Sequence, residues 1–395
     1  MVKNVLAGAG IQWWGRRFRL PSSPSPELSR NVLARLCFFV LCGILVAGLW
    51  PFHHPMNDVS WMRDSNGVEF GAHGTIMSLA AFDAPRSDGQ GSCSLELWLQ
   101  PESIKHDGTM LEFSTAQSPR MFSMLQIHGD LVLRTEARNG EPHWIPVDNV
   151  LHPHRAVFIN ITSGLQGASI YVDGALVRST QAHLCWFSGR LVVGDSAVSH
   201  DTFRGRVLGL AIYGDELTAT QVRGHFASWT TKGAPDRLAN EQRVAIYLFD
   251  ERRGDVVHSK VGPDRDLIIP EKYALLRQIR LQPLWTEFRD RWSYWKDLAI
   301  NVAGFVPLGV CFCAYFSLAR QMPRAAMATV VLGALVSFTI EFLQSYLPTR
   351  DSGTTDLITN TFGTFVGVVL YQRVAASQLG RGIAAYFMRS QDEKR

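Results

Sequence analysis

The stretch Leu36–Phe52, LCFFVLCGILVAGLWPF, decides how this chain is organised. Extended by Val32–Ala34, it is long enough to cross a bilayer, because about 20 helical residues span the hydrocarbon core. It is longer than the apolar part of a secretory signal peptide, and no small-residue cleavage site follows it. The sequence Trp50-Pro51-Phe52 combines an interfacial anchor with a helix stop. We therefore predict a retained transmembrane helix over residues 31–52, after a disordered cytoplasmic tail over residues 1–30.

Three further apolar runs lie near the C-terminus, and with the first they predict four transmembrane helices. They are Leu298–Leu318, Ala325–Leu347 and Leu357–Val374. Basic residues gather before the first helix, between the second and third, and after the fourth, for example Arg35, Arg320, Arg324 and Arg373. The positive-inside rule assigns these three groups to the cytoplasm. We therefore expect both termini in the cytoplasm and residues 53–296 outside it.

The long segment between the first two apolar runs predicts a soluble β domain. Hydrophobic residues make up 46% and charged residues 19% of the whole chain, an average that hides a split between membrane and soluble parts. Apolar and polar residues alternate in Ser94–Leu99 and Ala168–Val172, and Gly-containing turn signals separate such runs. This pattern predicts a β-sandwich over residues 58–270 and a linker over residues 271–296. The net charge of +4 is too small and scattered to indicate nucleic-acid binding.

Two of the six cysteines, Cys93 and Cys185, lie in the predicted β domain. They could form a disulfide if the domain lies in an oxidising compartment, or they could be buried free thiols. Sequence cannot give the separation of the two residues, so both alternatives stay open. The chain has no CxxC pair, and a zinc site is therefore not expected.

The order of motifs in the β domain resembles the LamG-like, concanavalin A-type jelly-roll. The matching segments are Cys93–Pro101 (CSLELWLQP), His154–Ser179, Gly189–Ser196 (GRLVVGDS) and Phe203–Val222. The resemblance implies an all-β jelly-roll sandwich. With the four apolar runs, which predict a four-helix transmembrane bundle, the expected fold class is mixed. The resemblance also implies a glycan or protein ligand, often held beside a calcium ion.

Candidate ligand-binding residues in the jelly-roll are few. Asp173, Asp195 and Asp201 are weak candidates for calcium ligands, and the resemblance implies no other cofactor. Asp173 has a simpler role in the Asp-Gly turn that it begins. Trp98 and Trp186 could stack on a sugar, although strand alternation favours Trp98 as a core residue. No carboxylate pair suggests the acid and nucleophile of a glycosidase.

Polar residues recur at helical spacing in the C-terminal apolar runs and predict a pocket. Asp297 and Asn301 are four apart, as are Asp356 and Asn360, so each pair shares one helix face. Ionisable groups inside a bilayer are costly, so these faces should turn toward one another near the outer leaflet. The predicted substrate-binding residues are Asp297, Asn301, Glu341, Gln344, Arg350, Asp356 and Asn360.

The same C-terminal residues resemble the VanZ-like family. The matching segments are Asp297–Gly309 (DLAINVAGFVPLG) and Ser337–Gly367, in which Gly363 and Gly367 would let a neighbouring helix approach closely. The resemblance implies a VanZ-like domain over residues 297–375, a cytoplasmic tail over 376–395, and a bacterial inner-membrane protein. The family name comes from a protein linked to teicoplanin resistance. Many members carry an acid where this chain has Gly353, and the chain has Asp351 nearby instead.

Three functions remain open, and the first is favoured. In the first, the chain is a non-enzymatic envelope protein whose jelly-roll binds a surface glycan or protein. In the second, it is a membrane enzyme acting on a lipid-linked glycan or phospholipid, with Glu341 or Asp356 as general base and Arg350 holding a phosphate. The polar faces could instead be a network that only fixes helix packing. The third function, a transporter, has the weakest support, because the four predicted spans show no internal repeat. The expected partners are the bilayer and a glycan or lipid-linked precursor, with no nucleic acid and with oligomers allowed.

Overall fold

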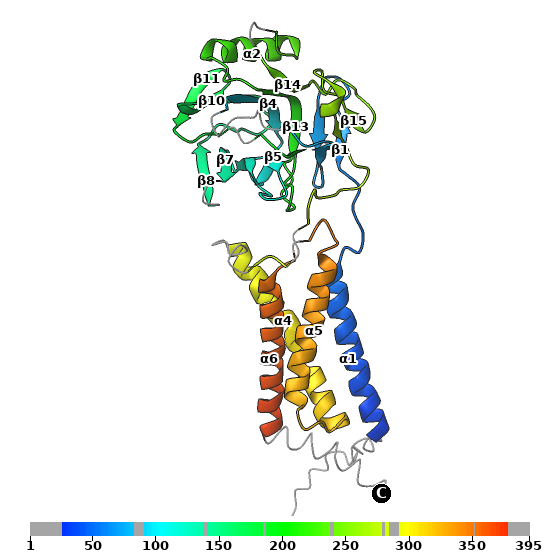
Figure 1. Ribbon diagram of the computed structural model, residues 1–395. Coiled ribbons are helices and arrows are strands. Elements are labelled where there is room, and N and C mark those ends of the chain that lie inside the picture. The colour runs from blue at the N-terminus through cyan, green and yellow to red at the C-terminus, as the bar shows by residue number, and fades with distance from the viewer. Residues whose placement is uncertain are drawn as a thin grey trace, which may run out of the picture. The chain divides into compact units, whose positions relative to one another are not determined.

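The computed structural model describes residues 26–82, 91–136, 141–184, 187–237, 241–278, 281–283, 292–350 and 352–377. They divide into two compact units (Figure 1). The helical unit holds residues 26–48, 292–340 and 355–377. The sandwich unit holds residues 49–283 and 341–354. The fold is therefore of the mixed class that the sequence predicts.

The sandwich unit contains two eight-stranded sheets, and every strand pair in them is antiparallel. The first sheet has the order β1 (Val59–Trp61), β2 (Val68–Phe70), β13 (Gly205–Tyr213), β4 (Cys93–Pro101), β9 (Val157–Gly164), β10 (Gly167–Val172) and β11 (Ala175–Thr180), and β14 (Arg243–Tyr247) also pairs with β13. The second has the order β15 (Val256–Val257), β16 (Leu267–Ile268), β3 (Ile76–Ser78), β12 (Arg190–Val193), β5 (Gly108–Ser114), β6 (Phe122–Ile127), β7 (Asp130–Glu136) and β8 (Pro142–Val147). A short 3-10 turn, η1 (Pro263–Arg265), precedes β16. Strands that are distant in sequence pair in both sheets, as a jelly-roll requires.

The hydrophobic core lies between the two sheets. Leu95 and Leu97 of β4 are fully buried in one cluster with Leu111 and Phe113 of β5. Alternate residues of each strand point into this core, which explains the period-two pattern of the sequence. Burying each such side chain contributes about 1.5–3 kcal/mol.

Helix α2 (Ala219–Lys232) covers the outer face of the first sheet (Figure 1). Thr218 and Gln221 form a capping box at its start, and Gly233 in the left-handed conformation ends it. Trp229 is fully buried against the sheet. The central strands of the first sheet are therefore buried on both faces.

The chain enters and leaves the sandwich at one place. The Asn57 N–H donates to the Glu271 carbonyl at 3.1 Å, and the Tyr273 N–H donates to the Pro55 carbonyl at 3.0 Å. These two segments are therefore paired side by side.

The helical unit is built from α1 (Pro26–Leu49), α4 (Trp292–Ala314) with the π-helical turn η2 (Tyr315–Ala319), α5 (Ala325–Gln344) and α6 (Thr354–Ala376). Among the described residues, three helices are long and apolar enough to cross a membrane, at Arg30–Leu49, Tyr294–Ala319 and Ala325–Gln344. The predicted fourth span, α6, is helical but is not among them. Its hydropathy is lowered by polar residues along its length: Thr355, Asp356, Thr359, Asn360, Thr361 and Thr364.

Glycines bring α4 and α6 into backbone contact. A Cβ added at Gly363 would lie 2.2 Å from the Val302 carbonyl oxygen, and one at Gly367 would lie 2.2 Å from that of Val306. No side chain larger than glycine fits at this separation, so the small residues allow the close approach that the sequence suggests.

Candidate functional site

Asp173 has a structural role in the turn between β10 and β11. Its φ is +49°, and its Oδ1 accepts the Phe158 N–H at 3.0 Å. An Asp-Gly pair in this conformation makes a tight hairpin turn. Asp173 thus lies in a turn of the first sheet. Asp195 and Asp201 follow β12 of the second sheet.

Asp195 and Asp201 lie together, but the Asp195 carboxylate is already bound by protein groups. Its Oδ1 accepts the N–H groups of Ser196 and Asp201 at 2.8 and 3.0 Å, and its Oδ2 accepts the Tyr273 hydroxyl at 2.5 Å. Burial raises the pKa of Asp195 to about 8, although these hydrogen bonds oppose the shift. Within the described part of the chain, no three His, Cys, Asp or Glu residues form a group able to hold a metal ion. Calcium binding stays a prediction.

Trp98 and Cys93, which the sequence also suggested as functional or paired residues, contribute to the structure of the sandwich. Trp98 packs beneath α2, with its ring centroid 6.3 Å from that of Trp229, so it contributes to the core. Cys93 is disulfide-bonded, and its predicted partner Cys185 lies outside the described residues, as does Trp186. The other four cysteines are free: Cys37, Cys42, Cys311 and Cys313.

A cavity of about 970 Å³ opens at one end of the second sheet. It is lined by Ala81, Phe82, Ser114, Thr115, Ala116, Ser188, Gly189, Arg190, Leu276 and Arg277. The lining comes from the end of β5, the start of β12 and two loops distant in sequence. The cavity therefore exists only once the second sheet has formed.

Backbone pairing fixes the wall of this cavity. Phe82 and Gly189 exchange two hydrogen bonds, at 2.6 and 2.8 Å. Gly189 has a φ of +91°, and a Cβ there would lie 2.2 Å from the Ser114 carbonyl oxygen. Both the positive φ and the short distance to the Ser114 carbonyl require a glycine at position 189. The wall is consequently formed before any ligand enters.

Sequence patterns did not identify the cavity, although one resemblance segment contains Gly189 and Arg190. The chemistry of the lining combines two guanidinium groups, three hydroxyl side chains and the apolar side chains of Phe82 and Leu276. Most small-molecule sites have this composition, with few polar groups on an otherwise apolar surface. No spacing rule could find it, because its residues come from separated segments.

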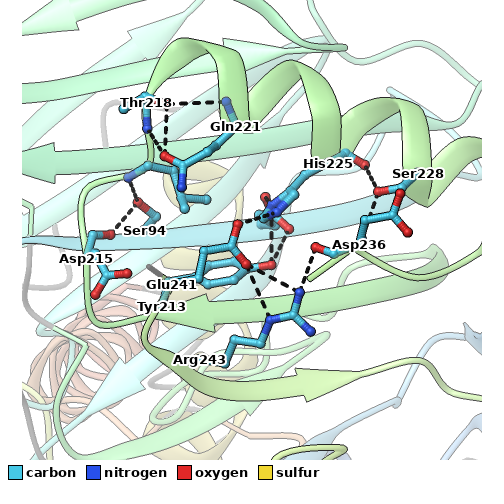
Figure 2. A network of polar contacts seen from close by, with 12 residues as sticks. Ser94, Tyr213, Asp215, Thr218, Gln221, His225, Ser228, Asp236, Glu241 and Arg243 are labelled. Carbon is cyan, nitrogen blue, oxygen red and sulfur yellow. Dashed lines mark hydrogen bonds and ion pairs between the residues drawn. The ribbon is translucent and has the colours of Figure 1, made fainter. Parts of the chain in front are cut away.

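A second polar cluster, which the sequence also did not reveal, is fully enclosed under α2 (Figure 2). His225 lies 2.7 Å from Glu96 Oε1 through Nδ1 and 2.8 Å from Glu241 Oε1 through Nε2. Tyr213 and Trp229 donate to Glu96 Oε2 at 3.0 and 2.9 Å. Burial lowers the pKa of His225, but the two carboxylates outweigh this effect and raise it. Through His225 and Trp229, these buried contacts link α2 to Glu96 of β4.

In the helical unit, two of the predicted pocket residues are hydrogen-bonded to each other, and a third is hydrogen-bonded to a serine. Asn301 donates from Nδ2 to Asp356 Oδ1 at 2.7 Å, and Asn360 donates from Nδ2 to Ser337 Oγ at 3.0 Å. The Oδ1 of Asn360 is buried without a hydrogen-bond partner among the residues described. Asp297, one turn before Asn301, is exposed.

The other predicted pocket residues belong to the sandwich unit. Glu341 is 1% exposed, and its Oε2 accepts the N–H of Gly353 at 2.9 Å. Arg350 donates from Nε to the Trp50 carbonyl at 3.1 Å, and Gln344 is buried. Gly353 stands where the resemblance leads one to expect an acid, and its backbone N–H donates to Glu341. Asp351 lies outside the described residues.

Two family models match separate parts of the chain. Residues 77–223 match the concanavalin A-like lectin/glucanases superfamily, and residues 248–375 match VanZ/LLP1. The VanZ/LLP1 match begins before the last strands of the sandwich. No curated protein matches the chain.

Solved structures resemble the sandwich only distantly. The receptor binding domain of botulinum neurotoxin D is 14% identical at a TM-score of 0.35, covering 46% of this chain and 48% of that one. A heptameric SAP-like pentraxin from Limulus polyphemus is 11% identical at 0.34, covering 55% and 94%. A Trypanosoma rangeli sialidase is 16% identical at 0.34, covering 44% and 29%.

The chain spans about half the length of the neurotoxin domains that it matches. At these TM-scores the likeness carries no argument about function. The two family matches agree with the motifs in the sequence and with the helices and strands of the two units. The chain is thus a membrane protein that joins a VanZ-like segment to a LamG-like domain of the concanavalin A-like superfamily.

Proposed function

We propose that this chain is a bacterial cell-envelope protein whose jelly-roll binds a glycan outside the cytoplasm while the VanZ-like helices hold it in the inner membrane. The observation that carries this proposal is the cavity of about 970 Å³ at the end of the second sheet. It is preformed by backbone pairing between Phe82 and Gly189, and hydroxyl and guanidinium groups line it. Such groups match the hydroxyls and ring oxygens of a sugar. The family resemblances support the envelope location.

Filling the cavity should abolish glycan binding. Ser188 lines the cavity, whereas Ser179 of β11 lies at the edge of the first sheet, so Ser188→Phe and Ser179→Phe make a matched pair. The full-length protein in mild detergent would be melted with a panel of free cell-envelope glycans. We expect at least one glycan to raise the Tm of the wild type and of Ser179→Phe but not of Ser188→Phe. If no glycan raises the wild-type Tm, or if Ser188→Phe responds equally, this function is wrong.

A second candidate function is a membrane enzyme acting on a lipid-linked glycan or phospholipid. The observation that favours it is the Asn301–Asp356 pair on two apolar helices, together with the unpartnered Oδ1 of buried Asn360. A positioned carboxylate can act as a general base, and an unpaired buried oxygen can accept a bond from a substrate. The roles that the sequence suggests for Glu341 as an alternative base and for Arg350 as a phosphate-binding cation stay predictions.

The enzyme proposal is tested by incubating the detergent-solubilised protein with a radiolabelled lipid-linked glycan precursor and separating the products. An enzyme should convert the substrate, and Asp356→Asn should lose conversion while keeping the wild-type Tm. A purely structural role for Asp356 predicts instead a lowered Tm and no conversion by the wild type.

A further inference from the structure

The glycan cavity carries positive charge that no carboxylate in the described chain neutralises. Arg190 donates from Nε and Nη2 to the Ser78 carbonyl at 3.0 and 2.6 Å. Arg277 donates from Nη1 to the Ala116 carbonyl at 2.7 Å. Neither guanidinium lies within 4.0 Å of an Asp or Glu oxygen among the described residues, so both charges are held only by neutral oxygens.

A third arginine adds to this charge behind the cavity wall. Arg265 donates from Nη1 to the Ala81 carbonyl at 3.1 Å, and its guanidinium lies 5.0 Å from the ring centroid of Phe82. It also has no carboxylate partner among the described residues. Among the described residues, these three guanidinium groups have no carboxylate within 4.0 Å, and they create a positive potential because their interactions with an entering anion add up while those with carbonyl dipoles fall off quickly.

The arginines that line the cavity keep donors available for a ligand. A guanidinium has five N–H groups. Arg190 uses two of its nitrogens on Ser78, and Arg277 uses one on Ala116. Burial lowers the pKa of Arg190, which is the effect of desolvating a cation without an anion beside it. A bound anion would offset that cost.

We propose that this cavity selects an acidic saccharide, one that carries a carboxylate or phosphate group, and that Arg190 and Arg277 pair with the anion. The proposal rests on the proposed glycan-binding function and names the ligand class of the same cavity. Planar guanidinium groups match both anions through paired N–H donors, and such charge-assisted bonds are the strong ones. Thr115 and Ser188 also line the cavity, and their hydroxyls are hydrogen-bonded to Ser118 and to Met121 Sδ.

The test compares an acidic oligosaccharide with its neutral twin. Oligogalacturonate and its fully methyl-esterified form would be titrated calorimetrically into the full-length protein in detergent. We expect the acid to bind at least about tenfold more tightly than the ester, which corresponds to about 1.4 kcal/mol. The preference should shrink as NaCl rises from about 50 to about 200 mM, because salt screens the attraction. A short poly(glycerol phosphate) serves as second probe, and its affinity relative to oligogalacturonate tells whether phosphate or carboxylate is the preferred anion.

Two variants show whether the cavity arginines cause the preference. Arg277→Gln removes one cavity guanidinium, whereas Arg178→Gln removes an exposed guanidinium on β11 that is likewise bound to a carbonyl. We expect Arg277→Gln to lose about tenfold in affinity for the preferred acidic probe and Arg178→Gln to bind like the wild type. Equal binding of acid and ester, or an equal loss in both variants, would overturn the proposal. If the ester still binds and Ser188→Phe abolishes that binding, glycan binding stands and only the acidic class is wrong.

Discussion

At the residue scale, the buried carboxylate of Glu96 is the group on which the attachment of α2 depends most. It is fully buried and accepts hydrogen bonds from Asn160, Tyr213 and Trp229, and it pairs with His225. Replacing it by an apolar residue of similar size would leave four buried donors without an acceptor. Removing one partner of such a buried ion pair lowers the stability of the fold strongly, even though the intact pair stabilises the fold little more than apolar side chains of the same size would.

Glu96→Leu should lower the free energy of unfolding by about 3–5 kcal/mol, because it removes one partner of a buried ion pair and leaves the donors of Tyr213 and Trp229 without their acceptor. Asp236→Asn is the control, since it breaks an ion pair with Lys232 in which both side chains are exposed. We expect that control to cost no more than about 1 kcal/mol. Denaturant titration of the full-length protein in detergent, followed by tryptophan fluorescence, measures both. Similar losses in the two variants would contradict the structural role of Glu96.

Asp195 should make the stability of the sandwich depend on pH. Its pKa is about 8 in the folded chain and has the ordinary value of 3.8 when exposed, so the folded state holds the proton more tightly. The stabilisation is complete below pH 3.8 and is lost as the pH rises through 8. Asp195→Asn keeps an oxygen acceptor and removes the titration. The variant's free energy of unfolding, measured at pH 4, 6 and 8 by the same titration, should therefore fall less with pH than that of the wild type. A constant difference between the two proteins across this range would show that Asp195 does not titrate there.

At the element scale, the packing of α4 on α6 depends on glycines that meet the opposite backbone. Gly367→Val would place a branched side chain where a Cβ alone is 2.2 Å from the Val306 carbonyl oxygen. The helices must then move apart, and overpacking of this kind costs about 1–3 kcal/mol. Gly304→Val on α4 is the matched control, because no atom lies within 4 Å of a Cβ at that position. The Tm in detergent should fall for Gly367→Val and stay near the wild-type value for Gly304→Val. The reverse order would exclude this α4–α6 contact.

At the scale of the whole molecule, the number of membrane crossings decides the topology. In the part of the chain that the structure describes, three helices qualify as spans by length and hydropathy, whereas α6 is of similar length but more polar. We expect α6 to cross as well, because its polar residues Asn360 and Thr364 are buried within the helical unit. Alkaline phosphatase fused after residue 377 should therefore be inactive, as a cytoplasmic location requires. The same enzyme inserted between residues 261 and 262, in an exposed loop of the sandwich, should be active. An active C-terminal fusion would mean three crossings.

The disulfide at Cys93 fits an extracytoplasmic sandwich, because disulfides persist in oxidising compartments. The backbone N–H groups of Asn57 and Tyr273 join the entry and exit segments of the sandwich, so the chain enters and leaves the domain at neighbouring points. Both features concern the sandwich unit by itself.

The sequence by itself determined the class of the protein and most of its elements. Runs such as Leu36–Phe52 specify membrane helices, because burial in lipid requires only that neighbouring residues be apolar. Alternation in Ser94–Leu99 specifies a strand with one face in the core. Helical spacing also showed that Asp297 and Asn301 share one helix face, as do Asp356 and Asn360. Each of these signals is local in the chain.

Only the tertiary structure decided which distant side chains meet. Arg190 and Arg277 share one cavity, and Glu96 and His225 share one buried cluster, although each pair is far apart in sequence. Their meeting depends on strand order and register, and a shift of one residue would turn each strand's side chains to the other face. Hydrophobic pattern constrains which face is buried but leaves the polar partners on that face unspecified. The cavity and the cluster therefore had no signature in the sequence, because their residues meet only after both sheets and the helix over them have formed.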